Sequence, residues 1–227
     1  MKALDLFCCA GGASDGLVAA GFDVTGVDIK RRPNYPHKFI EADAVTLDID
    51  LSEFDFIWAS PPCQRYSVAT KSQGEKFNPD DYPDLVDPIR QKLKGHPFTC
   101  IENVMGAPLR RDLILTGPSV GLTRIERKRV FELSFLCLNP GAPGLPRSVW
   151  KSGEAITITT SLSCKSHFYP RKRAGKPGRV PAWEACEAMG ITRPMTAHEV
   201  GEAIPPAYSE FIAREAIRQG CGQRMAA

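Results

Sequence analysis

The stretch ALDLFCCAGGASDGLVAAGFDVTGVDI, residues 3–29, contains the succession of elements that decides the fold. The apolar run ALDLF predicts a buried strand, the small residues CCAGGAS predict a tight turn, and DGLVAAGF predicts a helix. The run DVTGVDI predicts a second strand that ends at Asp28. A strand, a glycine turn, a helix and a second strand form the opening unit of a doubly wound α/β fold.

Further elements continue this α/β pattern along the chain. Strands are predicted at FIEA (39–42), FDFIWAS (54–60), PFTCIENV (97–104) and RKRVFELSF (127–135). Helices are predicted at YPDLVDPIRQKLKG (82–95), PAWEACEAMG (181–190) and PPAYSEFIAREAIRQG (205–220). Because ligands of such sheets bind beyond the carboxyl ends of the strands, the residues at those ends are the candidates for function.

The composition is that of one globular domain with room for a small appended lobe. The 227 residues are 43% hydrophobic and 24% charged. No apolar run approaches the ~20 residues that span a bilayer, so we expect no membrane partner and a cytoplasmic protein. None of the 8 cysteines belongs to a CxxC pair, so we expect mostly reduced thiols and no metal site.

Residues 138–181 differ from the rest because they are rich in proline, glycine and basic residues. We expect a main domain of residues 1–137 and 182–227, and a small irregular lobe of residues 138–181. Within the lobe, residues 165–179 include six basic side chains and no acidic one. A solvated loop and a nucleic-acid contact explain this run equally well, and the net charge of +3 does not decide between them.

The segment SPPCQ places Cys63 directly after a predicted strand. Two prolines restrict the backbone before it and would aim the thiol reproducibly, although a lone cysteine is more often an inert buried thiol. Glu102 lies at another strand end, and Arg127 and Arg129 are two apart, hence on one face of a predicted strand. Singly these are surface or ion-pairing residues; together they could stabilise a thiolate and bind an oxygen atom.

Two acidic residues follow the second and third predicted strands. A carboxylate at the position of Asp28 can bind both hydroxyls of a ribose. Asp43 could contact an adenine edge, or instead cap the turn at AVTLD. The first turn lacks the GxGxxG spacing of dinucleotide-binding proteins, so taken alone it is a weak signal.

Four motifs together resemble those of the DNA cytosine-5 methyltransferases: DLFCCAGGASDG, SPPCQRYS, ENV and RKRVF, in that order. The ending EAIPPAYSEFIA is similar to that of small phage-type members. The resemblance covers most of residues 3–135 and 182–213. It implies a Rossmann-like, S-adenosylmethionine-dependent methyltransferase fold with a mostly parallel, doubly wound sheet, and a target-recognition role for the small lobe.

The resemblance also implies a mechanism. The Cys63 thiolate would add to carbon 6 of a cytosine flipped out of duplex DNA, which activates carbon 5 toward the methyl group of S-adenosyl-L-methionine. Glu102 would hydrogen-bond to N3 and the exocyclic amine of the base. Arg129 would hold O2 and lower the pKa of the thiol, and Arg127 would assist or touch phosphate. The products are methylated DNA and S-adenosyl-L-homocysteine.

Further binding residues are implied by their places in these motifs. The cofactor would contact Phe7, Gly11 and Gly12 in the first turn, Asp28 and Ile29 after the second strand, Asp43, Pro61 and Glu202. Gln64, Arg65 and Ser67 would contact DNA, unless they form an ordinary polar loop. In the lobe, the expected DNA contacts are Lys165, Arg171, Lys172, Arg173, Lys176 and Arg179.

The chain departs from the family pattern at two places. Cys9 stands where the family usually has glycine, and the sequence Gly-Glu-Ala-Ile at 201–204 replaces the usual Gly-Asn-Ser-Val, which puts the cofactor role of Glu202 in doubt. The lobe is short, which predicts a short target or a homodimer in place of a monomer. Two alternatives stay open: a tRNA-type RNA cytosine-5 methyltransferase, and a non-catalytic DNA-binding homologue. A biological role in restriction evasion, restriction-modification or regulation is equally open.

Overall fold

The computed structural model describes residues 1–67, 78–158, 172–173, 176–177 and 180–223. Its centre is a seven-stranded sheet with the order β3-β2-β1-β4-β5-β7-β6. The strands are β1 (Lys2–Leu6), β2 (Asp23–Asp28), β3 (Lys38–Glu41), β4 (Phe56–Ala59), β5 (Thr99–Asn103), β6 (Leu113–Leu115) and β7 (Arg129–Leu133). Neighbours from β3 to β5 are parallel, whereas β7 is antiparallel to both β5 and β6.

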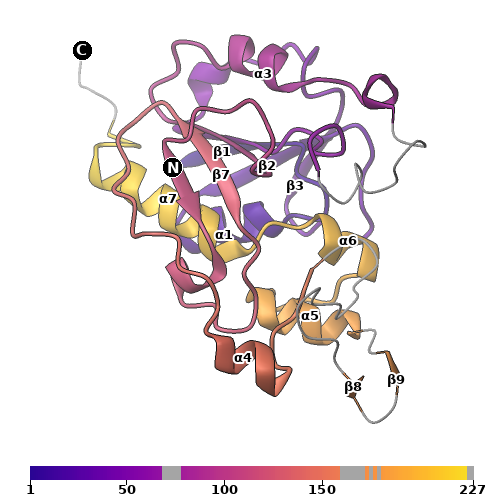
Figure 1. Ribbon diagram of the computed structural model, residues 1–227. Helices are drawn as coiled ribbons and strands as arrows, with labels where there is room; N and C mark the ends of the chain where they lie inside the picture. Colours follow the sequence, from indigo (N-terminus) through magenta and orange to yellow (C-terminus); the bar gives the residue numbers. More distant parts are fainter. Residues whose placement is uncertain (68–77, 159–171, 174–175, 178–179, 224–227) are drawn as a thin grey trace.

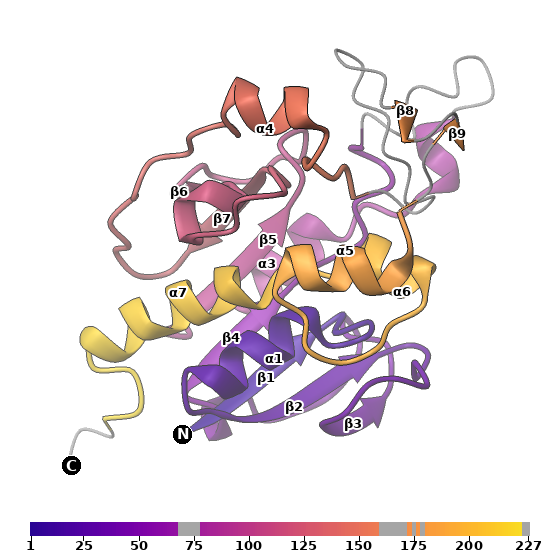
Figure 2. The same ribbon diagram turned by 90° about the horizontal axis from the view of Figure 1, so that it is seen from below.

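Helices cover both faces of the sheet. On one face lie α1 (Gly12–Ala19) and α7 (Pro206–Arg218), and on the other lies α3 (Val86–Lys92), as Figures 1 and 2 show. The residues of β4 alternate between the faces: Phe56 and Trp58 pack with α1 and α7, while Ile57 packs with α3. A strand covered on both sides must be apolar throughout, which explains why its sequence reads as a continuous hydrophobic run.

The expected strands and the opening β1-α1-β2 unit are present, but several predicted boundaries were wrong. The helix expected from residue 82 begins at Val86, which places Pro88 in the first turn, where a missing N–H group is tolerated. The strand expected from residue 127 begins at Arg129. Helix α1 begins at Gly12, three residues earlier than expected.

Two elements of the sheet and its surroundings were not predicted. Strand β6 is only three residues long and gives too little periodicity to be recognised. Helix α6 (Ala197–Glu202) is also short, but it carries a signal that sequence inspection could have used. Thr196 and Glu199 form a reciprocal capping box, in which each side chain accepts from the backbone N–H of the other residue.

A second group of elements lies beside the sheet. It comprises α4 (Arg147–Ser152), the hairpin of β8 (Lys172–Arg173) and β9 (Lys176–Pro177), α5 (Ala182–Met189) and α6. Figure 1 shows α4, α5 and the hairpin at the end of the molecule opposite α3. Ile125 pairs with Ile156, and a separate apolar cluster joins these two residues to Val180, Ala185 and Met189. This cluster draws on residues from both sides of the boundary expected after residue 181.

Short 3-10 helices complete the described fold, at η1 (Leu51–Glu53), η3 (Pro79–Asp81) and η4 (Gly117–Val120). Within the described part of the chain, no helix has the length and apolarity needed to cross a bilayer. The same residues contain no cluster of three or more histidine, cysteine or acidic side chains that could hold a metal ion.

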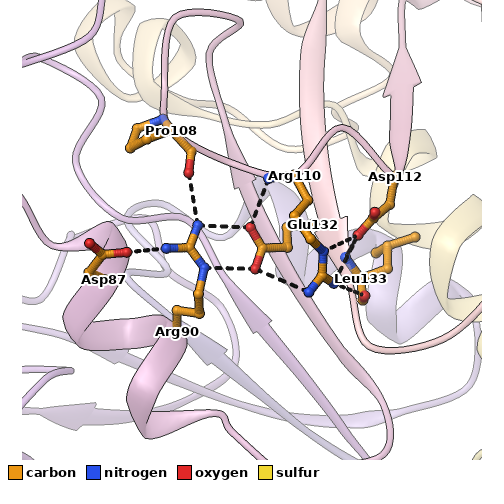
Figure 3. A network of polar contacts seen from close by, with 7 residues as sticks. All are labelled: Asp87, Arg90, Pro108, Arg110, Asp112, Glu132 and Leu133. Carbon is orange, nitrogen blue, oxygen red and sulfur yellow. Dashed lines mark hydrogen bonds and ion pairs between the residues drawn. The ribbon is translucent and has the colours of Figure 1, made fainter.

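A charged network fastens α3 to the antiparallel side of the sheet (Figure 3). The carboxylate of Glu132, which is 4% exposed, accepts hydrogen bonds from Arg90 Nε at 2.8 Å and Arg90 Nη2 at 2.9 Å. The backbone N–H of Arg110 donates to the same carboxylate at 2.9 Å. Burial alone would raise the pKa of Glu132, but the Arg90 and Arg110 hydrogen bonds outweigh it and hold the pKa below its ordinary value. The network therefore depends on an ionised Glu132.

We predict that Glu132→Gln lowers the free energy of unfolding by about 2 to 4 kcal/mol, because it removes the buried counter-charge of Arg90 and leaves this side chain with the exposed Asp87 as its acidic partner. The matched control is Glu210→Gln, which removes an exposed i,i+4 pair with Arg214 and should cost less than about 0.5 kcal/mol. Urea unfolding followed by circular dichroism gives both values. Equal losses in the two variants would contradict a special role for the buried carboxylate.

Candidate active site

Cys63, Glu102 and Arg129 meet at one edge of three neighbouring strands, where β4 and β5 end and the antiparallel β7 begins. Cys63 follows β4, Glu102 lies near the end of β5, and Arg129 is the first residue of β7. Arg129 Nε lies 3.0 Å from Glu102 Oε1. The charges of Glu102 and Arg129 both act on the pKa of the Cys63 thiol, so the three side chains share one site.

Burial dominates the electrostatics of this site. It raises the pKa of the Cys63 thiol; Glu102 adds to the increase, while Arg129 and Arg127 oppose it. Burial also raises the pKa of Glu102, which is 4% exposed, against the opposing effects of Arg129 and of a hydrogen bond from Ser60. A carboxyl group in such surroundings retains its proton to a higher pH than usual, so it is suited to donate a hydrogen bond.

The loop that carries Cys63 is held by backbone hydrogen bonds. Asn103 Nδ2 donates to the carbonyl of Pro61 at 2.9 Å, so the end of β5 fixes the proline pair. The carbonyl of Cys63 accepts from the N–H groups of Tyr66 and Ser67, each at 3.0 Å. The function of Asn103 was missed from the sequence, and its only signal was a polar residue beside Glu102 in a buried strand.

Arg127 reaches the site differently from the prediction. It lies outside β7 with a φ of 31°, so it does not share a strand face with Arg129, and that prediction was wrong. Its guanidinium donates to the carbonyls of Ile158 at 3.3 Å and Gly201 at 2.9 Å, and also to that of Ala203. Burial lowers the pKa of Arg127 to about 9. These contacts use Nη1 and Nη2 to join the strand edge to the lobe and to the end of α6. The Nε atom of Arg127 is buried and has no hydrogen-bond partner among the described residues.

The polar residues after Cys63 are partly engaged with the protein. Arg65 Nη1 donates to the carbonyl of Tyr82 at 3.1 Å, and the side chain also lies 4.0 Å from the carboxylate of Asp84. Gln64 is exposed and Ser67 is half-buried. In the lobe, Lys172 and Arg173 form β8 and Lys176 lies in β9. The remaining predicted basic contacts, Lys165, Arg171 and Arg179, lie outside the described residues.

The first turn, after β1, has an unusual backbone. Phe7, Cys9 and Gly11 have φ values of 62°, 45° and 86°, in the region that favours glycine. Asp28 Oδ2 accepts the N–H of Cys9 at 2.9 Å and so holds the turn against the end of β2. The positive φ of Cys9 explains physically why a glycine would be easier at this position.

The ends of β2 and β3 suit an adenosine group. Ile29 is 73% exposed beside Asp28, so it offers an apolar surface next to a carboxylate. Asp43 is exposed beyond β3, although its Oδ1 also accepts the N–H of Val45 at 2.7 Å, as expected for turn capping. Pro61, by contrast, is buried.

The two glycines of the first turn are surrounded by protein. A Cβ atom on Gly11 would meet the ring of Tyr35, and one on Gly12 would overlap the backbone carbonyl of Ile204. Their side of the turn is therefore closed by packing, and any ligand contact there must use backbone atoms. The carboxylate of Glu202 pairs with Arg32 at 3.0 Å and with His198 at 3.3 Å, so α6 is tied to the loop after β2.

A buried polar group lies beneath this turn. Asp5 on β1 is 1% exposed and accepts a hydrogen bond from Ser14 Oγ at 2.5 Å, while Ser14 Oγ lies 3.1 Å from the hydroxyl of Tyr35. The other oxygen atom of Asp5 has no hydrogen-bond partner among the described residues. Burial raises the pKa of Asp5 to about 7.

Comparison with known proteins identifies the amino-terminal half. Residues 1–106 match the family model of the C-5 cytosine-specific DNA methylases. These residues belong to that family. The resemblance inferred from the motifs is thereby confirmed, and S-adenosyl-L-methionine is the cofactor. No curated protein matches the chain in sequence.

Solved structures share the fold of this chain over nearly its whole length. A DNMT2 mutant from Spodoptera frugiperda superimposes with a TM-score of 0.60 at 14% identity, over 95% of this chain and 99% of that chain. EhMeth from Entamoeba histolytica gives 0.60 at 13%, over 96% and 98%. A protein of an E. coli prophage, assigned as a DNA modification methyltransferase, gives 0.57 at 15%, over 96% and 99%. The expected S-adenosylmethionine-dependent methyltransferase fold is therefore confirmed.

We predict opposite changes in Cys63 reactivity when its two charged neighbours are neutralised. Glu102→Gln removes a charge that raises the pKa of the thiol, so alkylation of Cys63 by iodoacetamide at pH 8 should become several-fold faster. Arg129→Gln removes an opposing charge and should slow it. Mass spectrometry of the Cys63 peptide measures both rates. Changes in the same direction would mean that the variants alter access to the thiol and not its charge.

We also predict that Asp5→Asn changes how stability depends on pH. Because the folded protein keeps the proton on Asp5 up to about pH 7, whereas the unfolded chain loses it near pH 4, wild-type stability falls as pH rises between these values. Asparagine does not titrate, so the variant lacks this fall in stability. The stability of the variant relative to wild type should therefore rise by about 3 kcal/mol between pH 5 and pH 8. Urea unfolding at both pH values tests this, and a constant difference would refute it.

Proposed function

We propose that the protein methylates carbon 5 of cytosine in duplex DNA through a covalent bond between Cys63 and carbon 6 of the base. The observation that carries this proposal is the placement of the Cys63 thiol beside the Glu102–Arg129 pair, whose atoms lie 3.0 Å apart at the carboxyl edge of the sheet. Membership of residues 1–106 in a DNA methylase family supports DNA as the substrate.

The residues act on the base in a defined order. The Cys63 thiolate uses its electron pair to form a bond to carbon 6, and the electrons of the carbon 5–carbon 6 double bond shift toward the ring nitrogen N3. Glu102 donates its proton at N3, and Arg129 neutralises negative charge at O2. Carbon 5 becomes nucleophilic as a result. Bound S-adenosylmethionine would supply the methyl group and leave as S-adenosylhomocysteine. N3 returns its proton to Glu102, and loss of the carbon 5 proton to a base restores the carbon 5–carbon 6 double bond and expels the Cys63 thiolate.

The target base must leave the duplex for this reaction, because the thiol has to approach the face of the ring. Flipping costs a few kcal/mol, which contacts around the vacated position must offset. We assign that role to Gln64, Arg65 and Ser67, which directly follow Cys63. Asp28, Ile29 and Asp43 would hold the adenosine of the cofactor, with the backbone of Phe7, Gly11 and Gly12 completing its site. The carboxylate of Glu202 would act indirectly, through Arg32.

We further propose that residues 138–181 are the target-recognition region, inserted in a catalytic domain of residues 1–137 and 182–227. The support is the sequence, in which Lys172, Arg173 and Lys176 belong to a run of basic residues, together with the pairing of the Arg173 and Lys176 backbones in the hairpin of β8 and β9. Basic residues are what the phosphate backbone attracts. Arg127 would then act as a positioning residue, because it links Ile158 of this region to the catalytic edge.

The test uses a trapped intermediate. Duplex DNA or RNA containing 5-fluorocytosine is incubated with the protein and S-adenosylmethionine, and covalent complexes are resolved by denaturing electrophoresis. A base can remove the hydrogen of carbon 5 as a proton but cannot remove fluorine from the same position, so elimination is blocked. The Cys63 adduct should therefore accumulate on DNA, and it should be absent in Cys63→Ser. An adduct on RNA alone would favour an RNA methyltransferase, and no adduct on either substrate would favour a non-catalytic binding protein.

A further inference from the structure

Ser60 connects a buried tryptophan to the carboxyl group of Glu102. Trp58 and Ser60 are two residues apart at the end of β4 and therefore face the same side of the sheet. The indole Nε1 of Trp58 donates to Ser60 Oγ at 2.8 Å, and the hydroxyl of Ser60 hydrogen-bonds to the side chain of Glu102. None of the sequence motifs pointed to this connection.

The hydrogen bond between Trp58 and Ser60 has only one possible direction. An indole N–H can only donate, so Ser60 Oγ must accept from Trp58 and is left with a single proton of its own. That proton is directed at the Glu102 carboxyl group. Trp58 cannot turn away, because it is fully buried and packs edge-on against Phe131 with ring centroids 5.9 Å apart.

We propose that Ser60, with its hydroxyl oriented by Trp58, is a positioning residue that fixes the rotamer of Glu102 at the edge where Cys63 and Arg129 lie. The proposal rests on the proposed function, in which Glu102 contacts the cytosine ring. Ser60 touches neither the base nor the thiol in this scheme and acts only through Glu102. Loss of its hydrogen bond should raise the pKa of Glu102, because that bond opposes the effect of burial.

Other groups face Glu102 from every element around it, and their effects must be kept constant. Arg129 and Arg127 approach from the β7 side and favour its charged form, whereas burial opposes that form. The remaining ionisable neighbours are Cys63 after β4, Cys100 on β5 and Tyr208 on α7. None of them is changed in the variants below, so a shift in the titration of Glu102 reports on Ser60.

The experiment compares Ser60→Ala with Ser60→Thr, which keeps the hydroxyl, and with Trp58→Phe, which removes only the indole donor. Carbon-13 NMR of glutamate-labelled protein, assigned with Glu102→Gln, gives the titration midpoint of Glu102 without DNA. We expect the midpoint to move to higher pH in Ser60→Ala, to move less in Trp58→Phe and to stay near wild type in Ser60→Thr. An exposed serine variant, Ser148→Ala, is the control for labelling and folding.

The second readout is the rate of adduct formation with 5-fluorocytosine DNA and S-adenosylmethionine, both at saturating concentrations. We expect Ser60→Ala to slow it about tenfold through misplacement of Glu102, and Ser60→Thr to restore it. A slower rate with an unchanged Glu102 midpoint would overturn the proposal, since a merely structural serine would behave in that way. An unchanged rate would overturn it as well. If wild type forms no adduct, the proposed function fails, and the NMR titration still tests the link between Ser60 and Glu102.

Discussion

The ion pair between Arg129 and Glu102 depends on the antiparallel orientation of β7 relative to β5. In a fully parallel sheet, the residues that begin a strand lie at the edge opposite those that end its neighbour. Since β7 is antiparallel to β5, its first residue reaches the same edge as the end of β5. The reversal thus brings a positive charge to a carboxyl group that would otherwise be buried alone, at the point where Cys63 leaves β4.

The same geometry makes burial the main electrostatic influence on the site. A buried acid and a buried thiol both favour their neutral forms, and only nearby positive charge counteracts this tendency. Arg129 provides that charge directly. Arg127 provides it from further away, while its nitrogen atoms donate to backbone carbonyls of two other segments, at Ile158 and at Gly201 and Ala203. The site therefore combines a proton donor with an activatable sulfur without a metal cluster among the described residues.

Sequence was sufficient for those parts that depend on local periodicity and on motif order. The alternation of apolar runs and turns predicted the β1-α1-β2 unit. The order of the motifs that contain Cys63 and Glu102 was sufficient to recognise the family resemblance. It was insufficient where tertiary contacts decide. The contact between Asn103 and Pro61 joins residues 42 apart in the chain, and the conformation of Arg127 follows from carbonyls more than 30 residues away. No local pattern contains such information.

Packing of α7 against α1 has a consequence for how the protein folds during its synthesis on the ribosome. Gly12 faces the carbonyl of Ile204, and Gly16 faces Pro206 and Ser209, so the first turn is completed only by residues near the far end of the described chain. When β1 and α1 have left the ribosome, one face of α1 stays uncovered until residues 204–209 have emerged as well. Residues 1–106, which match the family model, therefore do not include the α7 residues that cover this face of α1.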